Sequence, residues 1–125
     1  MSALLQEIRA CAVGQAITDN DSRTMEFIFP PSFLGFQGHF PSQAILPGMV
    51  QIMAGIVTAE NGHPLTLLKV GRAKFSRIIM PLEPIRVTAS TSTKNGHVQA
   101  IVQIAVHDDI AASLTLELIP TGGGQ

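Results

Sequence analysis

Hydrophobic and polar residues alternate along the first part of the chain in a pattern that predicts two β-strands. Residues 8–17 form a weak strand candidate, whereas the alternation from Met25 to Phe29 predicts a half-buried strand. The polar residues 19–22 supply the turn between them, and Pro30 stops the second strand because proline has no backbone donor. The domain is therefore expected to begin with two consecutive strands.

A run of apolar residues at helical spacing predicts one helix from Gly48 to about Glu60, and Asn61-Gly62 supplies its C-terminal stop. The other faces of this helix are also nearly apolar, so the rest of the domain must enclose it on most sides. Residues 31–46, which precede the helix, form a long segment rich in Gly, Pro and Phe, as is typical of a functional loop. The helical spacing assigns to the core Met49, Ile52, Met53, Ile56 and Val57.

After residue 64 the pattern changes to strands, with no further helical signal. Strands are predicted at residues 65–75, 85–93, 97–106 and 110–119. Residues 94–96 and 107–109 supply hairpin turns. The pattern therefore predicts an α+β domain over residues 1–120, in which an antiparallel sheet curls around one central apolar helix, and a disordered tail at residues 121–125.

Composition narrows the possible partners. The 125 residues are 46% hydrophobic and only 14% charged, enough for one well-buried core. Eight basic and nine acidic residues give a net charge of −1, so neither nucleic acid nor an anionic membrane surface is an expected partner. The longest apolar stretch, residues 44–59, is shorter than the roughly 20 residues that span a bilayer.

Cysteine and histidine content gives no sign of a disulfide or a metal site. Cys11 is the single cysteine and is expected in the core. His63, His97 and His107 occupy turn-like contexts without metal-ligand spacing, so they are expected to face solvent. The N-terminus lacks the zones of a signal peptide, which predicts a cytoplasmic protein. No metal and no cofactor are expected.

The most informative segment is residues 38–52, GHFPSQAILPGMVQI. His39 lies in a loop whose path Pro41 and Pro47 restrict, because each proline fixes its own backbone and limits the residue before it. Gly48 lets a ligand approach the first backbone N–H groups of the predicted helix. The segment therefore predicts an oxyanion site beside a base.

This motif, in which His39-Phe40-Pro41 precedes Pro47-Gly48 and an apolar helix, resembles the signature of the β-hydroxyacyl-acyl carrier protein dehydratases, the FabA/FabZ branch of the hotdog fold. The resemblance runs from about residue 25 to residue 119. It implies a hotdog fold, a base at His39, and a thioester oxygen bound by the Gly48 N–H. It also implies dimers in which each site takes its histidine from one subunit and its carboxylate from the other.

The chain departs from the family at the position of the catalytic acid. The family carries an Asp or Glu fourteen positions after the histidine, and that position is Met53, which can neither donate nor accept a proton. The glutamine that supports the acid in the family is replaced by Val57. Glu60 lies about 10 Å further along the helix and cannot replace the acid. The third catalytic task is therefore vacant.

The resemblance also indicates residues around the substrate. The strand bordering the acyl tunnel would place Phe75 in the tunnel wall. Independently of the resemblance, Gln51 is the polar side chain nearest to position 53 and could bind a hydroxyl group by hydrogen bonding, although it cannot serve as a proton donor. The predicted substrate-binding residues are Phe40, Ile45, Pro47, Gln51, Val57 and Phe75. A basic stretch could dock an acidic carrier protein, although an ordinary solvated strand face explains it equally well: Lys69, Arg72, Lys74 and Arg77.

These observations favour a dehydratase-family protein that binds acyl thioesters on acyl carrier protein or coenzyme A, with weak or lost dehydration as a homodimer. An alternative is a non-catalytic hotdog subunit, or carrier-binding module, that pairs with a carboxylate-bearing partner. A hotdog thioesterase ranks last, because it needs a carboxylate to activate water and the helix carries none near the motif.

Overall fold

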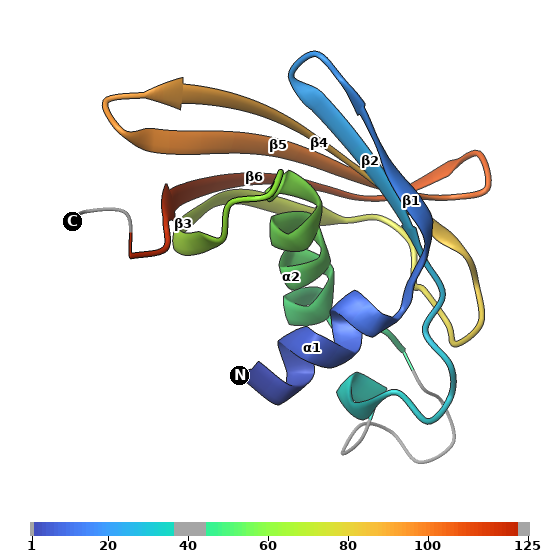
Figure 1. Ribbon diagram of the computed structural model, residues 1–125. Helices are drawn as coiled ribbons and strands as arrows, with labels where there is room; N and C mark the ends of the chain where they lie inside the picture. The colour runs from blue at the N-terminus through green and yellow to red at the C-terminus, as the bar shows by residue number, and fades with distance from the viewer. Residues whose placement is uncertain (1, 37–44, 123–125) are drawn as a thin grey trace.

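A computed structural model describes residues 2–36 and 45–122, in which one antiparallel sheet of six strands curls around a helix (Figure 1). The strand order is β1-β2-β4-β5-β6-β3, so β1 and β3 form the two edges. The elements in chain order are α1 (Ser2–Ala10), β1 (Ala12–Asp19), β2 (Ser22–Phe27), the 3-10 turn η1 (Leu34–Phe36), α2 (Gly48–Ala59), β3 (Leu65–Phe75), β4 (Ile85–Lys94), β5 (His97–Val106) and β6 (Asp109–Pro120). The predicted α+β hotdog architecture is confirmed.

The N-terminal segment differs from the prediction, because Ser2–Ala10 form a helix, α1, and the first strand begins only at Ala12. Ile8 is fully buried, and Leu4 and Leu5 pack against the core beside it. Positions 4, 5 and 8 lie on one face of a helix, which packs across α2 in Figure 1. The short apolar stripe of α1 was missed because it covers barely two turns.

The sheet encloses α2 closely but leaves its first turn open. Ile52 and Val57 are buried as predicted, and Ile56 packs against the core while partly exposed; Met53, which the motif assigns to the site, is buried as well. The prediction for Met49 is wrong, because its side chain is 57% exposed. The apolar surface of α2 therefore continues into solvent at the start of the helix.

Glycine brings the middle of α2 against the sheet. A Cβ atom at Gly55 would lie 3.1 Å from a methyl carbon of Val102 on β5, so this position tolerates no larger side chain without movement of its neighbour. Thr58, which is fully buried on the same helix, satisfies its hydroxyl by donating to the Ala54 carbonyl at 2.9 Å. The helix is thus held at a short, fixed distance from the sheet.

Phenylalanine side chains fix the start of the long segment that precedes α2. Phe27 of β2 stacks on Phe29 with ring centroids 5.9 Å apart, Phe29 contacts Phe33 at 4.7 Å, and Phe33 meets Phe36 edge-on at 5.6 Å. All these rings are buried. Such aromatic pairs stabilise a fold beyond their buried area, so the chain leaves β2 along a defined path as far as residue 36.

Glu60 joins three elements at the C-terminal end of α2. Its Oε1 accepts a hydrogen bond from the Arg9 guanidinium of α1 at 2.6 Å, and its Oε2 accepts one from the Leu65 backbone N–H of β3 at 2.9 Å. The Glu60 side chain is only 9% exposed. Hydrogen bonds to a charged group with so little water around it are stronger than those between neutral groups.

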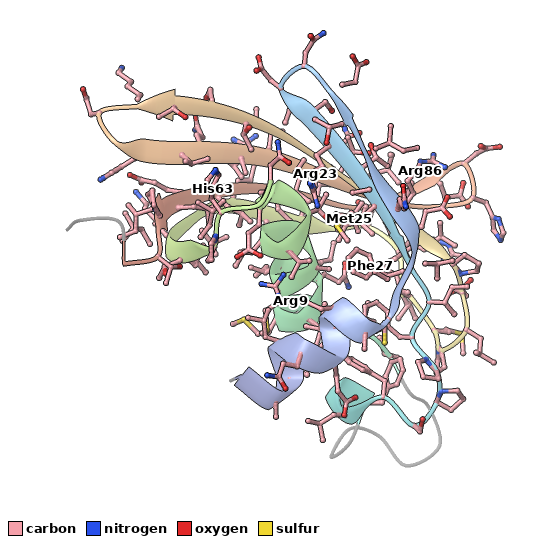
Figure 2. All side chains as sticks on the ribbon, in the orientation of Figure 1. Arg9, Arg23, Met25, Phe27, His63 and Arg86 are labelled. Carbon is pink, nitrogen blue, oxygen red and sulfur yellow. The ribbon has the colours of Figure 1, made fainter. Side chains whose placement is uncertain are left out.

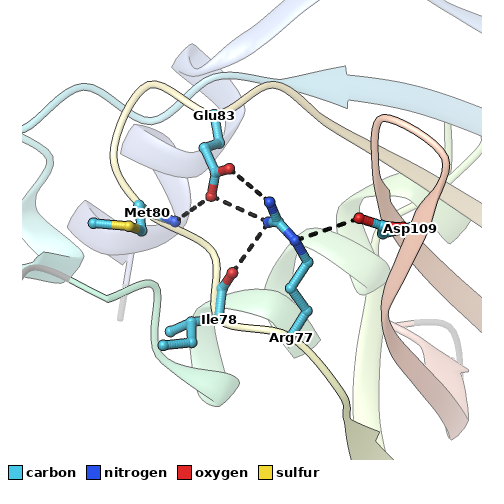
Figure 3. A network of polar contacts seen from close by, with 5 residues as sticks. All are labelled: Arg77, Ile78, Met80, Glu83 and Asp109. Carbon is cyan, nitrogen blue, oxygen red and sulfur yellow. Dashed lines mark hydrogen bonds and ion pairs between the residues drawn. The ribbon is translucent and has the colours of Figure 1, made fainter.

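A second ion pair holds the segment between β3 and β4, shown in Figure 3. The Arg77 guanidinium donates to both carboxylate oxygens of Glu83, at 3.2 and 2.9 Å, and Glu83 also accepts from the Met80 N–H at 2.9 Å. The hydrogen bond from Arg77, followed by the one from Met80, holds the pKa of Glu83 below its ordinary value. The pKa of Arg77 is raised by the same hydrogen bond.

The same segment is tied to the chain that leads into α2. The Leu46 N–H donates to the Ile79 carbonyl at 2.8 Å, and the Leu82 N–H donates to the Phe29 carbonyl at 2.8 Å. Leu82 itself has a positive φ of 71°, an uncommon backbone conformation for a leucine, at the tip of this turn. These bonds position the start of α2 relative to the end of β3.

Replacement of Glu60 by alanine tests the junction of α1, α2 and β3. Glu60→Ala leaves the Leu65 N–H and the Arg9 guanidinium without their acceptor, so we expect the free energy of unfolding to fall by about 2 kcal/mol in urea denaturation. Glu117→Ala is the matched control, because Glu117 pairs with His97 between side chains that are 41% and 49% exposed. Equal losses for both variants would contradict the assigned role of Glu60.

Acidification tests the Arg77–Glu83 pair. Because the pKa of Glu83 is lowered in the folded state, its carboxylate stabilises the fold above the ordinary value of 4.5, and this contribution is lost as the pH falls through the lowered pKa. Glu83→Gln should therefore lower the melting temperature at pH 7, and its difference from wild type should shrink toward pH 3. Glu26→Gln, at an exposed position on β2, is the control. A difference that stays constant with pH would contradict the pairing.

Candidate functional site

A cavity of about 680 Å³ opens at the first turn of α2. It lies between the start of this helix and the chain that leaves β3, two segments joined by the Leu46–Ile79 hydrogen bond. The predicted residues Ile45, Gly48, Gln51 and Phe75 all line it. The structure thus brings together four side chains or backbone groups that the motif assigns to substrate binding. The other lining residues are Leu46, Ser76, Arg77 and Ile78.

The backbone at the start of α2 presents unpaired donors. Pro47 precedes the helix in an extended conformation, with φ −66° and ψ 153°, and gives no side-chain cap. The first intrahelical bond runs from the Gln51 N–H to the Pro47 carbonyl at 3.1 Å. The N–H groups of Gly48, Met49 and Val50 consequently find no acceptor among the described residues. Together with the helix dipole, these donors favour negative charge at this end of the cavity.

Glycine at position 48 permits the ring of Phe75 to cover the helix start. A Cβ atom added at Gly48 would lie 3.0 Å from Cζ of Phe75 and 3.3 Å from Cε2, so a larger residue would push the ring away. Phe75 is 46% exposed and can therefore move without disturbing the core. The Phe75 ring therefore lies directly against Gly48, beside the backbone donors.

Gln51 follows Gly48 by one turn and is 4% exposed. Its Nε2 donates to the Leu46 carbonyl at 3.2 Å. Its Oε1 is buried and accepts no hydrogen bond from the residues that the structure describes. Within an otherwise apolar helix face, Gln51 thus places a half-satisfied amide at the wall of the cavity.

The position of the family acid does not reach this cavity within one chain. Met53 is 4% exposed and belongs to the hydrophobic core. Val57 lines a different cavity, of about 380 Å³, together with Arg9, Arg23 and His63. Figure 2 shows Arg9, Arg23, Met25 and His63 around the front of α2, contributed by α1, β2 and the loop after α2. No Asp or Glu is among the described residues that line the Gly48 cavity.

Three further residues were predicted to belong to the site: His39, Phe40 and Pro47. His39 and Phe40 lie outside the described residues, so their assigned roles stay predictions. Pro47 is half-buried directly before α2 and does not line the cavity, although it sets the direction from which the chain enters the helix.

The predicted basic stretch divides between two faces. Lys69, Arg72 and Lys74 are exposed on β3 and pair in register with Glu117, Thr115 and Ser113 of β6. These β6 residues alternate with Leu114, Leu116 and Leu118, which are buried in the hydrophobic core, so the basic residues occupy the outer face of the sheet. Irregularities in the β3–β6 register keep all three on that face despite their uneven spacing.

Arg77 lies apart from the other basic residues. It lines the Gly48 cavity, and its guanidinium is engaged by Glu83 and lies 3.9 Å from Asp109. Sequence reasoning assigned Arg77 to a docking surface and did not identify Glu83, although an acidic residue six positions away was the available signal. Leu46, Ser76 and Ile78 were also missed as lining residues, and each is a chain neighbour of a predicted one.

The remaining titratable residues show little that is typical of a site. His63, His97 and His107 are exposed, as predicted. Burial, followed by the charge of Glu7, raises the pKa of the Cys11 thiol, which packs against the core. Within residues 2–36 and 45–122, no group of three His, Cys, Asp or Glu is placed to hold a metal ion. In the same ranges, neither helix combines the length and apolar character needed to cross a membrane.

Comparison of the fold with solved structures gives close matches at low sequence identity. The dehydratase heterocomplex ApeI:P from Xenorhabdus doucetiae superposes with a TM-score of 0.66 at 18% identity, covering 86% of this chain and 96% of that chain. The fluoroacetyl-CoA-specific thioesterase FlK gives a TM-score of 0.66 at 14% identity, covering 83% of this chain and 94% of that chain. Both matches support the hotdog fold.

Sequence comparison narrows the family. The 3-hydroxyacyl-acyl-carrier-protein dehydratase FabZ of Psychrobacter arcticus is 28% identical over 123 residues, covering 88% of this chain and 80% of that protein. The family model ApeI-like, described as ApeI dehydratase, matches residues 15–114. The predicted resemblance to FabA/FabZ-like dehydratases is confirmed, and the chain belongs to the ApeI-like dehydratase family.

Proposed function

We propose that this protein binds 3-hydroxyacyl thioesters, carried on acyl carrier protein or coenzyme A, in the cavity at the start of α2. The observation that carries this proposal is the set of backbone N–H groups at Gly48 and the next residues, which have no acceptor among the described residues and lie beside a cavity that Phe75 lines. A thioester carbonyl oxygen would accept from the Gly48 N–H, and the acyl chain would lie against Phe75. The apolar side chains Ile45, Leu46 and Ile78 suit that chain.

The chemistry of dehydration assigns a task to each group. A base removes the proton from C2, negative charge grows on the thioester oxygen, and the C3–O bond breaks as an acid protonates the departing hydroxyl, which leaves as water. By the family motif His39 would act as the base, and the Gly48 N–H would stabilise the oxyanion. The thioether of Met53 cannot supply the proton.

The missing acid predicts low activity for a homodimer. General acid catalysis contributes roughly 10² to 10⁴ in rate, so we propose that dehydration by this chain alone is weak or lost. Met53 is also buried in the protomer core, which gives water little access to replace the acid. Thioester binding at Gly48 requires neither Met53 nor Val57, because both lie outside that cavity.

A second candidate function is that of a subunit that contributes its histidine and oxyanion site to a partner. In the family as a whole each site is shared between subunits, and the ApeI:P structure is a dehydratase heterocomplex. Exposed apolar side chains near the Gly48 cavity favour burial by a second hotdog chain: Met49, Phe75, Ile78, Met80 and Leu82. Such a partner would carry an Asp or Glu at the position of Met53.

The outward basic residues favour a carrier protein over a free coenzyme A thioester. Lys69, Arg72 and Lys74 form a positive strip along the edge strand β3, whose last residue is Phe75 of the cavity wall. An acidic carrier would be attracted to this strip, and the attraction would weaken with salt. Thioesterase activity, known for the fold neighbour FlK by its name, is disfavoured because no described carboxylate lines the cavity.

Substitution of Gly48 by alanine tests the binding site. The added methyl group would lie 3.0 Å from the Phe75 ring, displace this ring from the cavity wall and itself lie beside the backbone donors, so we expect at least tenfold weaker binding of a 3-hydroxyacyl thioester in calorimetric titration. Gly71→Ala on β3 is the matched control, because a Cβ atom there meets its nearest neighbours at ordinary distances of 3.6–3.9 Å. Unchanged binding by Gly48→Ala, with the fold intact, would contradict the proposed site.

Restoration of a carboxylate tests the missing acid. Met53→Glu should raise the rate of water loss from a 3-hydroxyacyl thioester by 10²-fold or more, followed by the absorbance of the enoyl product. Met49→Glu, at a position of the same helix where the side chain is 57% exposed, controls for added charge. Since position 53 is buried, circular dichroism must show that each variant is folded. A folded Met53→Glu variant without any gain would contradict the assignment of position 53.

The subunit hypothesis is decided by mixing. Wild-type chain alone, and mixed with a carboxylate-bearing hotdog chain, would be assayed for the same water loss and analysed by size-exclusion chromatography. Activity that arises only in a mixed complex supports the subunit function. An active homodimer that forms no complex with the second chain, and whose activity the second chain does not change, contradicts it.

A further inference from the structure

The starting observation is the unpaired oxygen of Gln51. Of the described residues, the buried polar side chains are Gln51, Thr58 and Glu60, all on α2 or at its end. Thr58 and Glu60 satisfy their polar atoms within the fold. The Oε1 of Gln51 is buried and accepts no hydrogen bond from a described residue. Because buried polar atoms in native proteins are almost always paired, this exception calls for a partner that the described residues do not supply.

The orientation of the Gln51 amide is fixed by its surroundings. Its Nε2 donates to the Leu46 carbonyl, which can only accept, so the amide nitrogen occupies that side and the oxygen occupies the other. Leu46 is held in turn by the hydrogen bond from its N–H to the Ile79 carbonyl at 2.8 Å. The Gln51 Oε1 is therefore held in a fixed position at the wall of the Gly48 cavity, where it can accept a hydrogen bond from a donor group.

The distance from Gly48 to Gln51 along the helix is similar to the separation of the carbonyl oxygen and the 3-hydroxyl group on one acyl thioester. Three residues advance an α-helix by about 4.5 Å, and the two positions lie on adjoining parts of one cavity wall. A 3-hydroxyacyl thioester carries its hydroxyl two carbons from the carbonyl. With the carbonyl oxygen at the Gly48 N–H, that hydroxyl is within reach of an amide one turn further along.

Building on the proposed function, we propose that Gln51 is a specificity-determining residue whose Oε1 accepts a hydrogen bond from the 3-hydroxyl group of the bound acyl thioester. The amides and hydroxyl groups of the carrier arm are the other donors on such a ligand. They leave the thioester on the side opposite to the acyl chain and must lead to solvent, whereas Gln51 is 4% exposed. Phe75, at 46% exposure, can move aside as the hydroxyl enters.

Such a hydrogen bond would let the protein distinguish a 3-hydroxyacyl thioester from thioesters that lack the hydroxyl group. A saturated acyl thioester, or the 2-enoyl product of dehydration, has no donor at C3 and would leave Oε1 unpaired. One neutral hydrogen bond to a buried acceptor corresponds to a preference of about tenfold for the 3-hydroxy compound. The same difference would favour release of an enoyl product wherever the chain takes part in an active complex.

The experiment compares three pantetheine thioesters of equal length by calorimetric titration: (3R)-3-hydroxyhexanoyl, hexanoyl and trans-2-hexenoyl. Wild type should bind the hydroxy compound about tenfold more tightly than the other two. Gln51→Met, which keeps the length and removes the acceptor, should abolish this preference, and Gln51→Leu should do the same. Gln99→Met, the same change at an exposed position of β5 outside the cavity, should retain it. Amide NMR spectra establish that each variant is folded.

The outcomes separate this proposal from the proposed function. The three ligands share one carrier arm. An equal loss of all three affinities in Gln51→Met would therefore mean that Gln51 supports the backbone or binds the carrier arm, and it would overturn the proposal. Equal binding of the three ligands by wild type would overturn it as well, while thioester binding itself would stand. Failure of wild type to bind any of them would instead reject the thioester site.

Discussion

The burial of one apolar helix inside a curled sheet is the constraint from which the other features follow. Close packing at Gly55 fixes α2 against β5, and its buried face is almost entirely hydrocarbon. A helix enclosed in this way can offer polar backbone groups only at its ends. At the C-terminal end, the Glu60 N–H caps the helix while the Glu60 carboxylate binds α1 and β3. At the N-terminal end, the backbone N–H groups have no acceptor among the described residues and can bind a ligand.

That constraint also explains why apolar residues suit positions 53 and 57, where the family motif expects a carboxylate and its supporting glutamine. A carboxylate in the middle of an enclosed helix is costly, because a buried charge must be paired and hydrogen-bonded. Methionine at position 53 and valine at position 57 remove this cost, and both side chains are buried. This face of the helix therefore belongs to the hydrophobic core, and the backbone donors at Gly48 do not depend on it.

The sequence was sufficient to predict those features that depend on a repeated pattern. The enclosed helix from Gly48, the strands that follow it and the grouping of Ile45, Gly48, Gln51 and Phe75 could be derived from periodicity and from the family motif. The helix α1 could not, since its apolar face consists of only a few residues. Met49 obeys the helical spacing and is nevertheless exposed, because periodicity describes a helix face and not what covers it.

Contacts between distant segments were equally beyond prediction from a single sequence. The division of the basic residues between two faces depends on irregularities in the β3–β6 register, which no local pattern encodes. The engagement of Arg77 by Glu83 depends on the tight turn at Leu82. Both features decide which charges remain available to a partner, so the location of a docking surface required the fold.

Gln51 shows how the two kinds of information combine. By its spacing it is one more buried position of an apolar helix, and by its chemistry it is the exception there. Thr58 on the same helix carries a buried polar atom that its own backbone satisfies at 2.9 Å, so the fold is able to pair such atoms where only stability is concerned. The Oε1 of Gln51, which has no partner among the described residues, lies instead near the first turn of α2, where the backbone donors also lack an acceptor in that part of the chain. An acceptor and a set of donors left open along one cavity wall form a complementary pair for a ligand with a carbonyl oxygen and a nearby hydroxyl.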